Sequence, residues 1–307
     1  MCIRDSNNTI SHCEQAGIVG SLGAVFSTVT GNTIHDIHVR RLFSGAEMAG
    51  IKFHAAIDVE ISHNHIYRTI MGIWLDWMAQ GTHVTGNLLH DNIERDLFTE
   101  VDHGPILVDN NILLSHQALL TSSQGGAFVH NLIAGEICRQ NPFDDRMTPF
   151  HKAHSTAVAG LHNNPSGDDR YYNNVFVQGG DLSRYDDAKL PVWMGGNVFL
   201  KGARISKHEA EPLVKPEFDP AVKLVEKPDG FYLEMTFDKA WSAERTRKLV
   251  TTELLGKTAI SGCAYENQDG SPLKINTDYS GKPRNETNPK PGPFENPENG
   301  PVMLKIW

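Results

Sequence analysis

The sequence lacks a concentrated positive charge and a long apolar run. It carries 28 Lys and Arg against 37 Asp and Glu, a formal charge of −9, and its basic residues form no cluster. A nucleic acid or an anionic membrane requires a concentrated positive face, so neither partner is expected. No stretch approaches the roughly 20 apolar residues of a membrane span. A neutral or weakly charged ligand fits this composition better.

The sequence also lacks a cysteine pattern. The four cysteines lie far apart and include no C-x-x-C pair, which predicts neither a zinc site nor a disulfide framework. We interpret them as free thiols, and free thiols favour the cytoplasm over an oxidising compartment. The residues are Cys2, Cys13, Cys138 and Cys263.

The start of the chain shows no signal-peptide pattern of basic and then apolar residues. Residues 1–6 (MCIRDS) instead resemble a translated sequencing adapter, and a repeat begins in mid-pattern at residue 7. We therefore expect residues 1–6 to be non-native and the natural N-terminus to be missing, which leaves the compartment open.

An internal repeat runs through most of the sequence, in which asparagine precedes a short, mainly apolar pair. The repeating residues are Asn8, Asn32, Asn64, Asn87, Asn111, Asn131, Asn174 and Asn197. The steps between them are 24, 32, 23, 24, 20, 43 and 23 residues. We interpret the step of 32 as an inserted loop, the step of 20 as a shortened turn and the step of 43 as roughly two coils.

The segments between these asparagines alternate apolar and other residues, which is strand rather than helix periodicity. The spacing of a leucine-rich repeat is absent, so the sequence predicts an all-β chain folded as a parallel β-helix. Asparagines stacked at a turn can bond to one another and to the turn backbone, and we interpret them as structural.

The regular pattern fades after Asn197. We place the β-helix at residues 7–205 and a strand and loop extension at residues 206–307. Residues 231–237 (FYLEMTF) predict a strand, residues 243–249 a short helix, and residues 267–300 an irregular segment. Because the last coil of a solenoid exposes an open sheet edge, we expect this extension to cap it.

Consecutive coils align at residues 50–54 (GIKFH), 72–76 (GIWLD), 96–100 (DLFTE) and 118–122 (ALLTS). The apolar second and fourth positions mark the core face, so the third and fifth positions point outward. One outward column is then Lys52, Trp74, Phe98 and Leu120, and the other is His54, Asp76, Glu100 and Ser122.

Asp76 and Glu100 are the candidate catalytic pair. Strands in a ladder lie about 4.8 Å apart, which places the two carboxyl groups near the 5 to 5.5 Å of retaining glycosidases and below the roughly 6.5 to 9.5 Å of inverting ones. Repulsion should keep a proton on one of them to higher pH. The alternative is two solvated surface acids. Like charges stacked without a Lys or Arg between them are unfavourable, which favours function.

Other residues are expected to complete a pocket. Trp74 and Phe98 offer apolar faces for a sugar ring, and Glu47 lies just before the first aligned segment. Residues 146–154 fall in the 43-residue step and should form a projecting loop that is either a pocket wall or, with two histidines and no third ligand, a less well supported metal site. The substrate-binding candidates are Lys52, His54, Trp74, Trp77, Phe98, His103, Arg146, His151 and His154.

Residues 45–54 (GAEMAGIKFH), 72–81 (GIWLDWMAQG) and 96–104 (DLFTEVDHG) resemble the β-xylosidases of glycoside hydrolase family 120. The similarity continues through residues 250–256 (VTTELLG) and 291–295 (PGPFE). This resemblance implies a right-handed parallel β-helix with an inserted β-sandwich, with Asp76 as nucleophile, Glu100 as acid/base and Glu47 as a further pocket acid. Members of the family are about twice as long, so the sandwich and the first coils are not expected here.

The resemblance implies release of terminal xylose from β-1,4-xylo-oligosaccharides with retention, without metal or cofactor. Three alternatives remain at this point: an α-L-fucosidase-like hydrolase, a polysaccharide lyase or epimerase, and a glycan-binding β-helix without catalysis. A lyase needs a base and cations or calcium beside a uronate, whereas the column is acidic. The sequence leaves the oligomeric state open.

Overall fold

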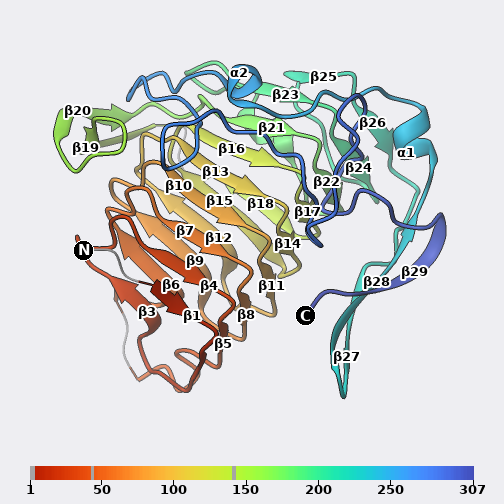
Figure 1. Cartoon of the computed structure of the whole chain (residues 1–307), viewed down its shortest axis with the longest axis horizontal. Coiled ribbons are helices and arrows are strands. Elements are labelled where there is room, and N and C mark those ends of the chain that lie inside the picture. The colour runs from red at the N-terminus through yellow and green to blue at the C-terminus, as the bar shows by residue number, and fades with distance from the viewer. Residues whose placement is uncertain (1–3, 43–44, 140–142) are drawn as a thin grey trace.

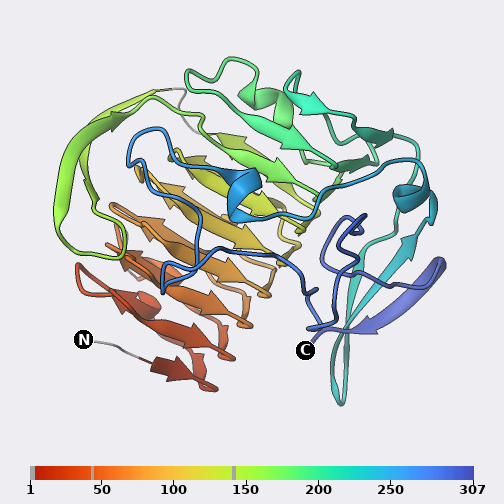
Figure 2. The same ribbon diagram turned by 45° about the horizontal axis from the view of Figure 1, so that its top comes forward.

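The chain winds into a right-handed solenoid whose coils add strands to parallel sheets (Figures 1 and 2). The computed structural model describes residues 4–42, 45–139 and 143–307. Strands of successive coils pair in parallel, and the apolar side chains of the three sheets meet in one central core. The predicted all-β parallel β-helix is therefore confirmed.

Three parallel sheets form the sides of the solenoid. Sheet A contains β1 (Arg4–Ser6), β4 (Thr28–Thr30), β7 (Glu60–Ser62), β10 (Thr82–Thr85), β13 (Ile106–Asp109), β16 (Gly126–Val129), β21 (Arg170–Tyr172), β23 (Trp193–Gly195) and β25 (Glu209–Ala210). Sheet B contains β2 (Thr9–Ser11), β5 (Thr33–His35), β8 (His65–Tyr67), β11 (Leu88–His90), β14 (Ile112–Leu113), β17 (Leu132–Ile133), β22 (Val175–Val177), β24 (Val198–Leu200) and β26 (Leu213–Lys215). Sheet C contains β3 (Ala16–Gly20), β6 (Ala49–His54), β9 (Met71–Asp76), β12 (Arg95–Glu100), β15 (Gln117–Ser122) and β18 (Glu136–Arg139).

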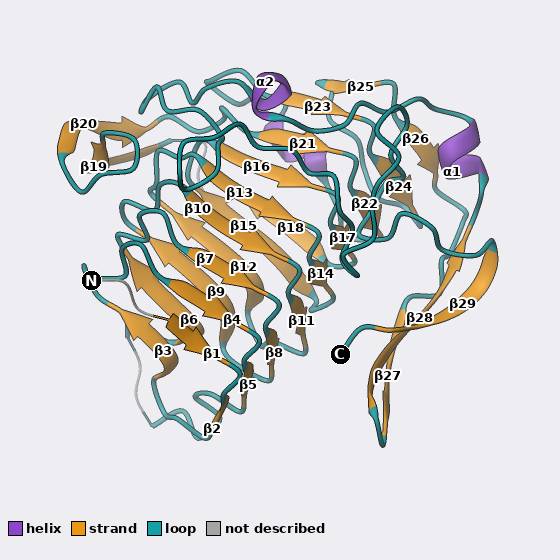
Figure 3. Cartoon of the chain, viewed as in Figure 1, coloured by secondary structure: helices purple, strands orange, loops and turns teal. Residues whose placement is uncertain are grey.

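The remaining elements are antiparallel strands and short helices (Figure 3). They are the hairpin β19 (Asp144–His151) and β20 (Val158–Asn164), the sheet β27 (Lys223–Lys227), β28 (Gly230–Phe237) and β29 (Gly300–Lys305), and the helices η1 (Leu182–Tyr185), α1 (Ala240–Ala243) and α2 (Thr252–Leu255). Within the described ranges, no helix has the length and apolar character needed to cross a membrane.

The strand predicted at residues 231–237 is β28, but the helix predicted at residues 243–249 is wrong. Helix α1 ends at Ala243 and the following residues are irregular. The backbone amide of Arg247 donates to Asn288 Oδ1 at 2.9 Å, and its side chain donates to the carbonyl of Gly196. These contacts with distant segments override the local helical preference.

The repeating asparagines form a continuous hydrogen-bonded ladder. Each follows a residue with positive φ, as in Gly86 (φ 64°) before Asn87 and Asn110 (φ 55°) before Asn111. Asn87 donates to Asn111 Oδ1 from both its backbone amide and its side-chain amide, each at 2.9 Å. Burying a polar group without a hydrogen-bond partner costs free energy. The ladder supplies such a partner in every coil that it crosses. The structural interpretation of these asparagines is confirmed.

The 43-residue step is one coil, not the two that the sequence suggested. The amide of Asn131 donates directly to Asn174 Oδ1 at 2.9 Å, so these residues lie in adjacent coils. The additional residues form the hairpin β19–β20, which leaves the solenoid between β18 and β21 and projects to the upper left in Figure 1. Length alone could not distinguish a second coil from an inserted hairpin.

The solenoid continues beyond residue 205, the boundary drawn from the sequence. Strands β25 and β26 add one further coil, in which the side chain of Glu209, opposite Met194, supplies the acceptor that a ladder asparagine supplies elsewhere. Its carboxylate accepts the backbone amide of Asn197 at 3.2 Å and the side-chain amide at 2.7 Å. The asparagine count therefore missed this coil. At the other end, Arg4–Ser6 pair with β4, while residues 1–3 and Cys2 lie outside the described residues.

Glu209 predicts a pH dependence of stability. Burial raises the pKa of its carboxyl from 4.5 to about 7, against the opposing effect of the bonds from Asn197. The unfolded chain releases this proton at lower pH than the folded chain does. The contribution of Glu209 to the free energy of unfolding therefore falls as pH rises from about 4.5 to 7. We expect a loss of about 2 to 3 kcal/mol over that window.

The variant Glu209→Gln carries no titrating proton and should lose this part of the slope. Urea unfolding at pH 5 and pH 7 measures the difference between the variant and the parent chain. Glu211→Gln, at an exposed position two residues later, is the matched control. Equal pH slopes for the parent chain and Glu209→Gln would contradict the assignment.

The C-terminal extension covers the sides of the solenoid rather than only its end, contrary to the expected cap. Leu233, Met235 and Ile306 pack in one cluster with outward residues of sheet B such as Leu88 and Ile112. Residues 250–275 cover outward apolar residues of sheet A in the same way, and Figure 2 shows this segment crossing that sheet. The extension lies there because these outward columns are apolar and need cover.

The three cysteines in the described part of the chain, Cys13, Cys138 and Cys263, are free thiols, as predicted.

Candidate active site

The register of sheet C is the one predicted from the aligned segments. His54 of β6 pairs with Asp76 of β9, Asp76 pairs with Glu100 of β12, and Glu100 pairs with Ser122 of β15. The core positions also align, since Ile73 lies between Ile51 and Leu97. Asp76 and Glu100 therefore face outward as direct neighbours on strands about 4.8 Å apart.

One oxygen of Asp76 is held by two nitrogen groups. Lys52 Nζ lies 2.5 Å from Asp76 Oδ2, and His54 Nε2 lies 3.0 Å from the same atom. The Lys52 side chain is fully buried, so this ion pair is shielded from water. The other oxygen, Asp76 Oδ1, is buried and has no hydrogen-bond partner among the described residues.

Glu47 belongs to the same charge cluster. Its carboxylate lies 3.7 Å from Lys52 Nζ and 3.6 Å from His54 Nε2. Lys52 Nζ also sits 3.6 Å above the ring centre of Trp74, a cation–π contact. The structure thus brings together Glu47, Lys52, His54 and Asp76, all of which the sequence had singled out.

Both oxygens of Glu100 are held. Arg146 Nη1 of the hairpin donates to Glu100 Oε1 at 2.8 Å, and the indole nitrogen of Trp74 donates to Oε2 at 3.2 Å. Asp144 fixes the other edge of the Arg146 guanidinium, with Oδ2 2.7 Å from Nη2. The sequence analysis did not single out Asp144, and its position two residues before Arg146 is the one signal that could have suggested it.

From the sequence we had assumed that the two carboxylates stack without a cation beside them. The structure shows that this assumption is wrong. Lys52 neutralises Asp76, and Arg146 neutralises Glu100. Lys52 reaches Asp76 diagonally from the neighbouring column, and Arg146 arrives from an inserted hairpin whose course has no sequence signature. The charges that support the pair are therefore tertiary contacts.

Trp74 and Phe98 do not present free faces for a sugar, so that prediction is wrong. They are only 8% and 5% exposed and stack on each other with ring centres 5.4 Å apart. Lys52 lies over the Trp74 ring, and Arg95 lies 5.2 Å from the Phe98 ring centre. Alternation placed the side chains on the correct face, but it could not show that cations and a neighbouring ring occupy their surfaces.

Trp77 is the exposed aromatic residue beside the pair. It is 39% exposed and directly follows Asp76 in the chain. Its φ of 41° is unusual for a bulky residue, and its amide donates to the carbonyl of Glu100 at 3.0 Å. This hydrogen bond joins the ends of β9 and β12.

Asp102 is a buried acid that the sequence analysis missed. It accepts the Ala79 amide at 2.7 Å and the Ser123 hydroxyl at 3.1 Å, so it ties together the turns that follow three successive strands of sheet C. Burial raises its pKa well above the usual range, and the charges of Asp76 and Glu100 act in the same direction. Asp102 therefore keeps its proton to higher pH than an ordinary aspartate does.

His103 lies beneath the hairpin rather than in the outward column. Its Nε2 contacts the carbonyl and the hydroxyl of Thr148 at 3.0 and 2.8 Å, and it is almost fully buried. Burial lowers its pKa to about 4, so the imidazole is neutral near pH 7. Its contacts support anchoring of β19, in place of the substrate contact predicted from sequence.

His151 and His154 hold the hairpin at two further points. The amide of His151 donates to Gln80 Oε1 at 2.9 Å, and burial lowers the pKa of its ring. His154 lies 2.9 Å from Asp58 and 3.1 Å from Glu266. These contacts lead away from Asp76 and Glu100, contrary to the expected pocket wall. No group of three or more His, Cys, Asp or Glu in the described residues is arranged to bind a metal ion.

Comparisons with known proteins agree with this architecture. The family model of the right-handed β-helix region matches residues 2–134. A search of curated proteins found no match. The solved structure of XylC in complex with xylose superposes with a TM-score of 0.93 at 38% sequence identity, over 99% of this chain and 52% of XylC. The chain thus spans about half the length of XylC. The chain therefore has the right-handed β-helix fold and is similar over nearly its whole length to one part of XylC.

Proposed function

We propose that this chain carries the catalytic centre of a retaining glycoside hydrolase that releases terminal xylose from β-1,4-xylo-oligosaccharides. The observation that carries the proposal is the direct pairing of Asp76 with Glu100 on adjacent strands. Adjacent strands lie about 4.8 Å apart, close to the 5 to 5.5 Å between the carboxyl groups of retaining enzymes, whereas an inverting pair must be wide enough to admit a water. The relationship to XylC, whose structure was solved with xylose, supports a xylose-containing substrate.

Asp76 acts as the nucleophile in this proposal. Lys52 and His54 hold Oδ2 and orient the carboxylate. The glycosidic bond breaks as a bond from the Asp76 carboxylate to the anomeric carbon forms, and Glu100 gives its proton to the departing oxygen. Water then attacks the same carbon and gives a proton to Glu100, and the bond to Asp76 breaks.

The two cations around the pair suit this sequence of steps. Lys52 holds the Asp76 carboxylate by an ion pair. Arg146, 2.8 Å from Glu100 Oε1, stabilises the Glu100 carboxylate that acts as a base in the second step. Asp144 is a positioning residue for Arg146.

Glu47 and Trp77 complete the substrate contacts. The Glu47 side chain is 28% exposed, and its carboxylate can accept a hydrogen bond from a sugar hydroxyl. Trp77 replaces Trp74 and Phe98 as the aromatic surface on which a sugar ring packs, because its ring is exposed. The lyase alternative is less well supported, since Lys52 is fully buried and bound to Asp76 rather than free to act as a base.

A panel of aryl glycosides tests the proposal. The chain should release nitrophenol from the β-D-xyloside faster than from the β-D-glucoside or the α-L-fucoside. Proton NMR of the first product should show β-xylose before mutarotation. Initial α-xylose would contradict a retaining mechanism, and unsaturated products absorbing in the ultraviolet would indicate a lyase. Glycan binding without turnover of any aryl glycoside would favour the non-catalytic alternative.

A further inference from the structure

A cavity lies on sheet A, on a different side of the solenoid from the Asp76 and Glu100 column. It has a volume of about 360 Å³, within the range of ligand pockets. Strands β7, β10 and β13 form one wall, and residues 265–269 with Leu273 of the C-terminal extension form the other. Glu60 and His83 of the first wall line this cavity.

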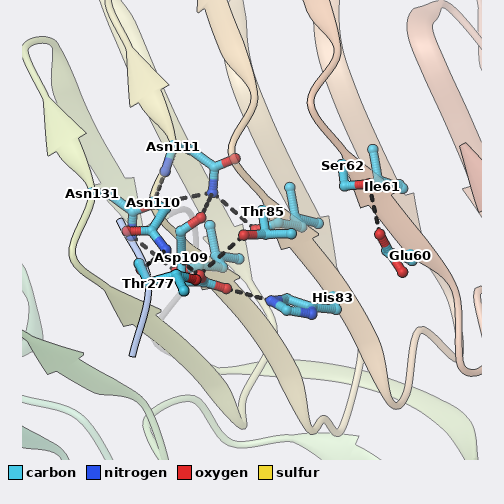
Figure 4. A network of polar contacts seen from close by, with 12 residues as sticks. Glu60, Ile61, Ser62, His83, Thr85, Asp109, Asn110, Asn111, Asn131 and Thr277 are labelled. Carbon is cyan, nitrogen blue, oxygen red and sulfur yellow. Dashed lines mark hydrogen bonds and ion pairs between the residues drawn. The ribbon is translucent and has the colours of Figure 1, made fainter. Parts of the chain in front are cut away.

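His83 is held in place by a buried carboxylate. Its Nε2 is hydrogen-bonded to Asp109 Oδ1, and Asp109 is only 3% exposed (Figure 4). The second oxygen of Asp109 accepts Thr85 Oγ1 at 3.0 Å and the Asn110 side-chain amide at 2.8 Å. Asp109 is thereby fixed from three sides, which orients the imidazole and leaves Nδ1 as the ring nitrogen for another partner.

The surroundings favour a proton donor at this ring. Burial lowers the pKa of His83, but the charge and hydrogen bond of Asp109 and the charge of Glu60 outweigh it, and the net pKa is raised. A charged imidazole donates from both nitrogens, so Nδ1 can donate while Nε2 stays on Asp109.

Glu60 places an acceptor directly beside this donor. It pairs with His83 in the register of β7 and β10, on strands about 4.8 Å apart. Its Oε1 accepts the Ser62 hydroxyl at 2.7 Å, which leaves Oε2 for another donor (Figure 4). Pro105, Leu107 and Leu273 supply an apolar surface in the same cavity.

We propose that this cavity is a second sugar-binding site, in which Glu60 accepts from one hydroxyl of a pyranose and His83 donates to its neighbour. A sugar hydroxyl both donates and accepts, which matches the paired groups. Glu266 and Asp269 in the cavity wall disfavour an anionic ligand. The described residues hold no three-ligand metal group there. The proposal does not rest on the catalytic role of Asp76 and Glu100.

Calorimetric titration with xylotriose tests the site, using the Asp76→Asn chain as background so that no substrate is consumed. Two binding events are expected. Adding Glu60→Gln or His83→Gln should weaken one of them about tenfold or more, because each removes a hydrogen bond to a charged group. His63→Gln, at an exposed position of a neighbouring turn outside the cavity, should leave both unchanged.

Unchanged binding in both cavity variants would overturn the proposal, as would a single event that neither variant alters. Crystals of the Asp76→Asn chain soaked in xylotriose provide a readout that requires no substitution in the cavity. Electron density for a sugar is expected between Glu60 and His83. If that density is absent while the sheet C site is occupied, the proposal of a second site is also overturned. If the chain hydrolyses no glycoside, the event sensitive to His83→Gln should still be present, so the two proposals fail separately.

Discussion

Replacing Asp76 by asparagine is expected to reduce turnover of an aryl β-D-xyloside by about 10⁴-fold or more. The substitution keeps the shape of the side chain and an oxygen for Lys52 and His54, but an amide oxygen cannot form the glycosyl ester. The loss should therefore appear in kcat with the fold retained, and the melting temperature should fall because the substitution removes the charge nearest to the buried Lys52. Steady-state kinetics and thermal unfolding of the same preparation measure both.

Asp91→Asn is the matched control, because Asp91 is an exposed aspartate on a turn of the same solenoid, and within the described residues its carboxylate pairs with the neighbouring His90. Its turnover should equal that of the parent chain. Added azide should restore part of the activity if a smaller residue, as in Asp76→Gly, opens space at the anomeric carbon, and the product should be the α-xylosyl azide. Undiminished turnover by Asp76→Asn would refute the nucleophile assignment.

Replacing Glu100 by glutamine should cost about 10²- to 10⁴-fold in turnover, and the size of the loss should depend on the leaving group. A poor leaving group such as an unactivated xylosyl oxygen needs the proton of Glu100, so xylobiose hydrolysis should show the full effect. A dinitrophenyl xyloside leaves without protonation, so formation of its glycosyl enzyme should be nearly unaffected. Burst kinetics separate that first step from hydrolysis of the intermediate.

Glu226→Gln, at an exposed position of β27, serves as the control and should behave like the parent chain with every substrate. The same loss for xylobiose and for the dinitrophenyl xyloside in Glu100→Gln would argue against an acid/base role. It would indicate instead that Glu100 only shapes the pocket through Arg146 and Trp74.

The sequence by itself determined the solenoid and the pairing of the two acids. The asparagine ladder sets one turn of each coil, and side chains alternate strictly with period two along a strand. Once the turns were aligned, the register of β9 and β12 followed, and with it the contact between Asp76 and Glu100. Both signals repeat from coil to coil, which is why a single sequence was sufficient to read them.

The end of the solenoid shows where this reading fails. Glu209 performs the ladder function of an asparagine with a different side chain, so the last coil left no mark in the repeat. The prediction for the segment that contains hairpin β19–β20 failed for a similar reason. An insertion inside a coil can have the same length as an additional coil.

Only the tertiary structure decided the environment of the pair. Arg146 reaches Glu100 from 46 residues away, Lys52 is buried against Asp76 from the coil before it, and Asp102 ties together three turns. It also showed that Trp74 and Phe98 are covered while Trp77 is exposed. These contacts join segments that have no common period, and their geometry depends on how the hairpin and the coils pack, so no repeat in the sequence could record them.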